Sequence, residues 1–585
     1  MVIVLVLVLA AGAAAAVFAL EAKAARDALN RAKFELSELS SQLNSGDQQA
    51  IQQTADVITA DVAEAAAIVD GPLWHIAAKV PFIGQNVDAV QRVTRAVDIL
   101  IERALPAGMQ FMSTVDLEKL TVEGGGIDLE PFRQVQGSIP EISAAFQAAQ
   151  AEVAPIDRSE LLPSVAEPID ELLTIIEGAA PALDVVNRYL PTLLDMAGSG
   201  GSKTYLVIFQ NNAEIRATGG NPAASMILTM TDGALGFAAQ ASAATFYEAG
   251  TVGNVYTELP PETLGLYLPT INQYSQDYTM TPDFPTTAQL FQTLWANTSG
   301  ANFDGVISID PVVLSHMLAV AGPVTLASGE QVTAENAASL LLSESYERYP
   351  DGRESDLFFA DVAQRVFTHL TTSTWDPLEM LAALETSAKE QRVYLSFVEP
   401  NAQALAVELG VDGALAPDTA AETQVGIYLN DSSVGKLEYH LTTTVAATCD
   451  PTARTMTTTM TMHNSIPDSI QSIYTLGYRN GGYGIPRTTM MLDVMFFAPP
   501  GAQILSTDPE FGMVEEWDRT GIEKGNTAVS RTVFVPQNET VTSSYTVALP
   551  AGELGPLNLR YTPTANPTVV TIDAGCGGLF GASTP

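Results

Sequence analysis

A strand, a polar loop and a second strand are predicted between Lys203 and Phe237. The run Tyr205–Phe209 is apolar, rich in β-formers and too short for an isolated helix. Polar residues follow it, and the chain is then broken by Gly219–Pro222 before a second β-like run, 224–230, which ends at an Asp-Gly turn. Loops carried by buried strands are where binding residues gather. The polar loop is therefore the first candidate for a functional site.

The motif in this loop resembles a known family signature. QNNAEIRATGG (residues 210–220), followed by a short strand and an Asp-Gly turn, is similar to the bacterial domain of unknown function 4012 (DUF 4012). Further similar stretches cover much of the chain: Trp74 with the break at 81–84, the block 303–323, the spacing from Asn430 to Lys436, and PPGA at 499–502. The resemblance implies a membrane-anchored envelope protein of the kind common in actinobacteria, and it implies no particular activity.

The first twenty residues carry no charge. As a helix, residues 1–20 would span about 30 Å, one hydrocarbon core. A cleaved signal peptide, with Ala13–Ala15 as its cleavage site, is the alternative. An anchor is favoured because an amphipathic helix follows without a break. No basic residue precedes the run, so we expect the true start codon to lie upstream of Met1 and the rest of the chain to lie outside the cell.

The remaining pattern predicts a multidomain α+β protein in four parts. Residues 21–197 show helical periodicity, with helices expected at 22–43, 47–69, 87–105, 130–153 and 160–196 in an antiparallel bundle. A Gly/Ser-rich joint at 198–202 precedes a central α/β domain with a mixed sheet, 203–415. Alternating Thr, Val and Tyr at 424–575 predict an immunoglobulin-like β-sandwich.

Composition and cysteine usage exclude several classes of function. The 585 residues carry a net charge of −40, from 27 Lys and Arg against 67 Asp and Glu, which disfavours nucleic acid as a partner. There is no phosphate-binding loop, dinucleotide fingerprint, HExxH or GxSxG motif. The only cysteines, Cys449 and Cys576, rule out a Cys₄ zinc site. Outside the cytoplasm they could pair, and two free thiols remain an equal alternative.

Candidate ligand-binding residues occupy the 211–220 loop and a charged segment at 347–356. Arginine suits phosphate because its planar fork makes paired hydrogen bonds, and paired glycines allow close backbone approach. The candidates are Asn211, Asn212, Glu214, Arg216, Thr218, Gly219, Gly220, Arg348 and Arg353. Asp304 and Asp310 bracket a strand and could hold Mg²⁺ on a diphosphate. The alternative is purely structural: mutual ion pairs, a helix cap at Asp310 and a turn at Asp304.

A more distant likeness concerns the order of elements over 203–370. A strand-turn-strand, DGVISID, a helix ending in GPV, an Arg-bearing loop and a Phe-rich helix are similar to LytR-CpsA-Psr envelope proteins. That likeness implies transfer of a glycopolymer from a polyprenyl diphosphate, with arginines on the diphosphate and Asp on the metal. The chain departs from it at RESDLFF (353–359), where several arginines are expected.

Two functional hypotheses follow from these patterns. The first is a non-enzymatic protein of envelope assembly or surface interaction, held in the membrane by residues 1–20 and engaging a cell-wall polymer or lipid-linked glycan. The alternative is a Mg²⁺-dependent glycopolymer transferase, whose catalytic residues the sequence does not identify. Convergence of Arg216, Arg348, Arg353 and one of the two aspartates on a cleft with an apolar tunnel would favour the transferase.

Overall fold

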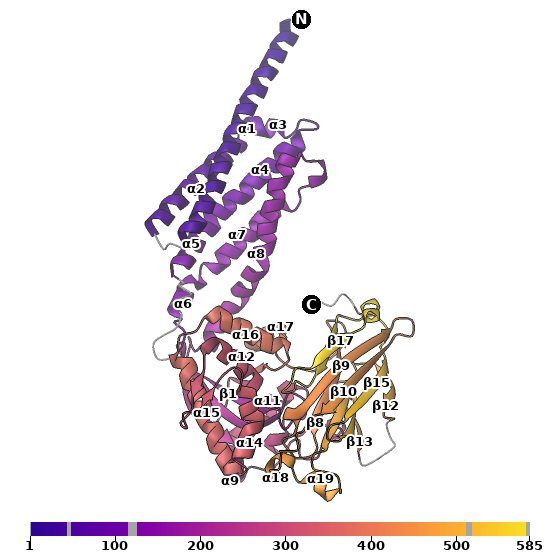
Figure 1. Cartoon of the computed structure of the whole chain (residues 1–585). Coiled ribbons are helices and arrows are strands. Elements are labelled where there is room, and N and C mark those ends of the chain that lie inside the picture. Colours follow the sequence, from indigo (N-terminus) through magenta and orange to yellow (C-terminus); the bar gives the residue numbers. More distant parts are fainter. Residues whose placement is uncertain (1, 44–47, 115–125, 511–516, 581–585) are drawn as a thin grey trace. The chain divides into compact units, whose positions relative to one another are not determined.

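The computed structural model describes residues 2–43, 48–114, 126–510 and 517–580 (Figure 1). The chain divides into two compact units, one of residues 1–120 and 127–200 and the other of residues 121–126 and 201–585. The division falls within the Gly/Ser-rich joint expected at 198–202. The predicted combination of a helical N-terminal region with several mixed sheets is confirmed.

The first unit, here called the helical unit, is built from eight labelled α-helices in its described part: α1 (Val2–Leu43), α2 (Gln48–Val69), α3 (Pro72–Ala77), α4 (Gly84–Ile99), α5 (Leu105–Thr114), α6 (Glu130–Gln136), α7 (Ile139–Val153) and α8 (Pro163–Met196). A π-helical turn, Leu100–Ala104, joins α4 to α5. The helix expected over 130–153 is in fact two helices, because the chain turns at Gly137 and Ser138. The helix expected at 22–43 follows the N-terminal run without a break, as predicted, so that both belong to one helix, α1.

Alanine allows α1 and α2 to pack closely as an antiparallel pair. Ala25, Ala28 and Ala32 of α1 are buried, as are Ala55 and Ala65 of α2. An ion pair between Arg31 and Asp61, 2.7 Å apart, fixes their register. A separate apolar core joins α4, α7 and α8 through Ala89, Ala96, Ala149, Val153, Ile169, Leu173 and Ile176.

No helix within the described residues is both long enough and apolar enough to cross a membrane. The side chains of residues 1–12 lie outside what the structure describes. The anchor expected at 1–20 therefore stays a prediction.

The second unit begins with a five-stranded mixed sheet. Its order is β3 (Ala234–Ser242), β2 (Asn221–Thr231), β1 (Lys203–Asn211), β4 (Gly305–Ile309) and β7 (Tyr394–Phe397). The β1–β4 pair is parallel and the other pairs are antiparallel. Side chains alternate across β1, so that Leu206 and Ile208 pack on helix α11 (Phe284–Ser299), whereas Val207 and Phe209 face the opposite side.

Helices cover that opposite side of the central sheet. They are α12 (Pro311–Ala321), α13 (Ala337–Ser339), a π-helical turn at Leu340–Glu344, α14 (Ser345–Arg348), α15 (Gly352–Thr372) and α16 (Pro377–Lys389). The central domain also contains α9 (Ala243–Glu248), α10 (Pro261–Leu264), α17 (Pro400–Glu408) and the short hairpin β5 (Val324–Thr325) and β6 (Gln331–Val332). Asp310 caps α12 by accepting from the backbone N–H groups of Val312 and Val313, as predicted.

Two five-stranded sheets follow and share one core. The first contains β12 (Gln503–Asp508), β15 (Thr540–Ala548), β10 (Thr455–Asn464), β9 (Leu441–Asp450) and β17 (Val569–Ile572). The second contains β13 (Asp518–Glu523), β14 (Asn526–Val535), β11 (Met490–Phe497), β8 (Thr423–Asp431) and β16 (Leu557–Tyr561). Short helices α18 (Ile473–Leu476) and α19 (Arg479–Gly482) connect β10 to β11. The two sheets face each other as a sandwich; its immunoglobulin-like character stays a prediction.

Two inner strands of the second sheet, β8 and β11, are buried on both faces. Every residue of β8 and β11 is buried. One face packs on the first sheet, and the other places Tyr428, Met495 and Phe497 against Leu266 and Tyr267 of the central domain. The sequence of a strand that is buried on both faces is nearly all apolar, as in β11, where Asp493 is the one polar residue of MMLDVMFF. The central domain and the sandwich therefore form one compact unit.

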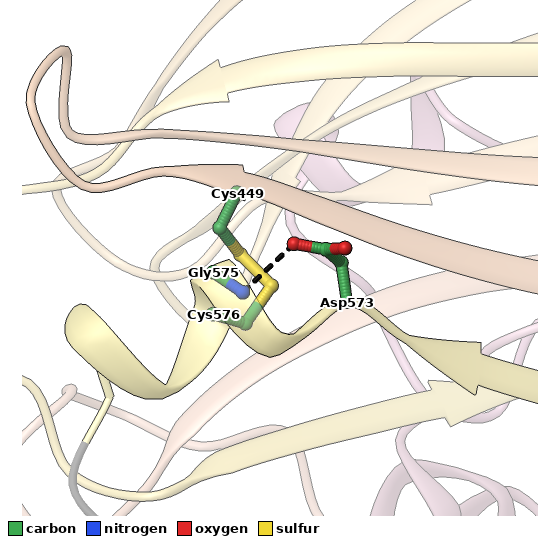
Figure 2. Close-up of a disulfide and its surroundings, with 4 residues drawn as sticks. All are labelled: Cys449, Asp573, Gly575 and Cys576. Carbon is green, nitrogen blue, oxygen red and sulfur yellow. Dashed lines mark hydrogen bonds between the residues drawn. A yellow bond between two sulfur atoms is a disulfide. The ribbon is translucent and has the colours of Figure 1, made fainter.

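Cys449 and Cys576 form a disulfide, which decides between the two alternatives that the sequence left open (Figure 2). Cys449 lies near the end of β9, and Cys576 lies in a short 3₁₀ segment, Ala574–Gly578. The Asp573 carboxylate accepts a hydrogen bond from the Gly575 N–H, 2.7 Å away. A Cβ on Gly575 would lie 2.9 Å from the Cys449 carbonyl oxygen, so glycine permits this close approach.

Candidate functional site

The 211–220 loop is closed by contacts with its own strand. The Gln210 side chain donates to the Thr218 carbonyl and to Ser308 Oγ, and accepts from the Gly220 N–H and from Thr218 Oγ1, at 2.6 to 3.0 Å. A Cβ on Gly220 would lie 2.1 Å from the Asn211 carbonyl oxygen, and Gly219 has a φ of 141°. The chain's own backbone occupies the space beside Gly220, and the side chains of Gln210 and Asn212 lie beside Gly219.

The tip of the loop inserts into the sandwich. Ile215 is fully buried and belongs to the core shared by the two sheets. Its carbonyl accepts from the Asp431 N–H at 2.8 Å, and the Ala217 N–H donates to the Asn430 side-chain oxygen at 3.0 Å. The Thr562 hydroxyl donates to the Ala217 carbonyl at 3.0 Å. The loop is thus a connector between the central domain and the sandwich.

Two charges carried by the loop are buried and already paired. Arg216 donates to Glu214 at 3.0 Å and lies 3.4 Å from Asp277; its side chain is only 5% exposed. The other Glu214 carboxylate oxygen accepts from Lys436 at 2.7 Å. Burial raises the pKa of Glu214, but the charges of Lys436 and Arg216 outweigh it and lower that pKa to about 2. These groups are neutralised within the protein and face no open cleft.

A pair of acidic side chains adjoins this ion-pair network. The Asp431 carboxylate accepts from the backbone N–H groups of Ser433, Val434 and Gly435. Burial raises the pKa of Asp431 to about 6 against the opposing charge of Arg216. Glu438 is fully buried, and neither of its carboxylate oxygens has a hydrogen-bond partner among the described residues. Burial and the charge of Asp431 raise its pKa well above the usual value.

The two asparagines reach different partners. Asn211 donates to the Tyr346 hydroxyl at 2.6 Å. Asn212 donates to the Asp310 carboxylate at 3.1 Å and to the Gly219 carbonyl at 3.2 Å. Asp310 is also paired with the buried Arg392, at 2.8 Å. Asn212 and Asp310 therefore belong to one internal network that holds the loop against the start of α12.

Asp304 and Asp310 do not meet. They flank β4 at its opposite ends, and Asp304 accepts instead from the Thr204 N–H at 2.8 Å. No group of three or more His, Cys, Asp or Glu side chains in the described part of the chain is arranged to hold a metal ion. The structure gives no support to the proposed magnesium role of these two residues.

The three candidate arginines have separate surroundings. Arg348 is half exposed and pairs with Glu330 at 2.7 Å and with Glu344 at 2.5 Å. Arg353 is exposed and lies in the first turn of α15, not in a loop, where its N–H donates to Asp351. Because Arg216 is buried with partners of its own, the convergence required by the transferase hypothesis is absent from these residues.

An apolar cavity of about 350 Å³ lies between the central sheet and its covering helices. This cavity was not predicted from the sequence. The apolar residues on both faces of β1 and β4 did indicate that each side of the sheet is covered by an apolar layer. The strands contribute Val207, Phe209, Ala224, Met226, Leu228, Leu235, Ile307 and Ile309. The helices contribute Pro311, Leu314, Met317, Leu341, Leu342, Phe359, Val362, Ala363, Val366, Phe367, Leu370 and Leu384.

The polar residues of the cavity wall are few, and most come from the family motif or its partners: Gln210, Asn211, Asp310, Tyr346 and Thr371. The only charged group among them is Asp310, which Arg392 already neutralises. The motif singled out from sequence thus lies at the cavity through its first two residues, while its later residues fill the junction with the sandwich.

These features define a class: an α+β protein whose central domain joins a sandwich through a buried loop and encloses an apolar cavity. Residues 200–346 match the family model described as "Protein of unknown function (DUF4012)", so the family resemblance is confirmed for this part of the chain. The comparison with curated proteins finds no significant match. The matched segment supplies β1 to β4, α12 and Tyr346, and hence much of the cavity wall.

Proposed function

We propose that this chain is a membrane-anchored extracytoplasmic protein of the cell envelope that binds a hydrocarbon chain, from a lipid or a lipid-linked glycan, in its central domain. The observation that carries the proposal is the apolar cavity beside the family motif. Its volume of about 350 Å³ falls in the range of small-molecule sites, about 300–1,000 Å³. An apolar cavity of even about 150 Å³ takes up benzene in preference to water.

Other features support the location rather than the ligand. The disulfide suits an oxidising compartment outside the cytoplasm. The uncharged run 1–20 suits an anchor, and the strongly acidic composition suits a soluble body on the far side of the bilayer.

The chemistry of the cavity wall favours binding over transfer. Asn211 and Tyr346 can orient a polar end group, but no arginine or lysine lines the cavity among the described residues. A diphosphate would find no unpaired cation beside it. Mg²⁺-dependent binding of a polyprenyl diphosphate, lost in Arg216→Ala while the fold is retained, would instead support the transferase hypothesis.

Photo-crosslinking tests the cavity directly. A fatty acid that carries a diazirine group is added to the full chain in detergent, irradiated, and the labelled peptides are mapped by mass spectrometry. We expect labels on peptides from β2, α12 and α15. Ala363→Trp, which places an indole in the cavity wall, should abolish these labels because it fills the available volume.

The matched control is Leu357→Trp, on the same helix α15 but 72% exposed and outside the cavity. It should leave the labelling unchanged. Labels confined to residues 1–20 in the unsubstituted protein, or equal labelling of the two tryptophan variants, would contradict binding in the cavity.

A further inference from the structure

The end of α3 and its connection to α4 expose several large apolar side chains. We call residues 76–83 (IAAKVPFI) the apolar loop. Within it Phe82 is 95% exposed, Ile76 is 64% exposed and Ile83 is 51% exposed. Contiguous exposed apolar side chains of this size mark an interaction site rather than a random surface.

The backbone holds the loop in a strained conformation. Phe82 has a φ of 71°, a left-handed conformation that costs free energy for any residue with a Cβ. The turn is closed by a hydrogen bond of 2.8 Å from the Gly84 N–H to the Val80 carbonyl. A Cβ on Gly84 would lie 2.3 Å from the Ala78 carbonyl oxygen. The fold therefore presents a phenylalanine in an unfavourable conformation without burying it, which indicates a use for its side chain outside the chain.

The loop is fixed beside the end of the uncharged N-terminal run. Trp74, in α3 two residues before the apolar loop, packs on Phe18 of α1 with ring centroids 4.9 Å apart. Buried Ala25, Val69 and Val87 complete that contact. In Figure 1, α3 lies alongside α1, and the N-terminal part of α1 extends past the other helices of the helical unit. If residues 1–20 cross a bilayer, Phe18 and Trp74 are at its surface.

The charge of the loop suits a lipid surface. The stretch 71–87 contains no Asp or Glu, although the whole chain has a net charge of −40. Lys79 is exposed within the apolar loop and can contact lipid phosphate. An exposed phenylalanine, here Phe82, beside an exposed lysine is typical of segments that lie in the membrane interface.

We propose that the apolar loop inserts into the interfacial layer of the same bilayer that residues 1–20 span. The helical unit then has two membrane contacts, which fix its orientation and its height above the lipid. The occupant of this surface is the lipid bilayer itself. This inference rests on the anchor in the proposed function, and it is independent of the cavity.

Spin labels test the depth of the loop. The full chain is reconstituted into phosphatidylcholine vesicles, with a label at either Phe82→Cys or Phe34→Cys. Phe34 is the matched control because it is also an exposed phenylalanine, 68% accessible, and lies on α1 about 24 Å beyond Phe18. At position 82 we expect severalfold greater relaxation by oxygen, which partitions into lipid, than by a water-soluble nickel chelate; position 34 should show the reverse.

Each other outcome overturns the proposal in a recognisable way. If both variants float with the vesicles but the labels at positions 82 and 34 are equally exposed to water, insertion of the loop is contradicted and the anchor is supported. If neither variant floats with the vesicles, both the anchor and the insertion of the loop are contradicted. Dipolar broadening between labels at position 82 of different chains assigns the surface to a second copy. Circular dichroism and an intact Cys449–Cys576 disulfide confirm that the variants fold.

Discussion

Arginine residues that looked alike in the sequence have different roles in the structure. Arg216 is buried between Glu214 and Asp277, whereas Arg353 is exposed in the first turn of α15. A buried charge that loses its partner costs much more than an exposed one, because the remaining charge keeps its desolvation penalty. The burial of a residue, not its type, decides whether it is part of the scaffold.

Arg216→Ala should therefore destabilise the second unit by about 3–5 kcal/mol, since the buried Glu214 and the partly buried Asp277 each lose a paired cation. Urea unfolding followed by tryptophan fluorescence measures this. The matched control, Arg353→Ala, should leave the midpoint unchanged because its side chain is exposed. An unchanged midpoint in Arg216→Ala would contradict a structural role for this arginine.

Glu438 makes the stability of the second unit depend on pH. Its pKa is raised in the folded state by burial and by the charge of Asp431. Below about pH 4.3 the carboxyl is protonated in both the folded and the unfolded state. As the pH rises from there, the unfolded state releases its proton first, so the free energy of unfolding falls until the pH passes the raised folded-state pKa. Asp431, with its pKa raised to about 6, acts in the same direction.

We expect Glu438→Gln to make this decline shallower above pH 4.3, because the amide cannot titrate. The urea midpoint measured from pH 4 to pH 8 gives the slope. Glu553→Gln removes an exposed carboxylate from the same unit and should keep the slope of the unsubstituted protein. Equal slopes for both variants would contradict a raised pKa for Glu438.

The burial pattern of a strand depends on which other segments pack against its two faces. Strand β10 alternates between buried and half-buried residues because one face points away from the core, and its Thr/Met alternation was recognisable. Strand β8 is buried along its whole length because the central domain covers its second face. Its polar residues Asn430 and Asp431 form hydrogen bonds with the backbone of the 211–220 loop. Likewise, the charged segment at 347–356 is in fact the end of α14 and the capped start of α15, with Asp351 as the cap.

At the scale of the molecule, the second unit is joined by side chains that belong to both of its parts. Ile215 extends from the central sheet yet packs in the core of the sandwich. Lys436 of the sandwich pairs with Glu214 of the central domain, 222 positions away. The central domain and the sandwich should therefore unfold together, while the helical unit has cores of its own.

Ile215→Ala should lower the stability of the whole second unit by about 2–5 kcal/mol, since it leaves a cavity in a shared core. Differential scanning calorimetry should show one transition of the second unit moving to lower temperature. The matched variant Ile169→Ala, equally buried in the helical unit, should move only the other transition. Separate transitions for the central domain and the sandwich would contradict this coupling.

The sequence by itself determined the local features of this protein. Periodicity identified the helical region, the strands of the central sheet and the alternating strands of the sandwich, and the motif QNNAEIRATGG indicated the family whose model matches residues 200–346, because these signals lie within neighbouring residues. Only the tertiary structure decided that the motif loop is a buried connector, that Cys449 pairs with Cys576, and that a cavity lies above β1 and β4. Each of those outcomes depends on which distant segments pack together, and burial of a side chain follows from that packing rather than from its neighbours in the chain.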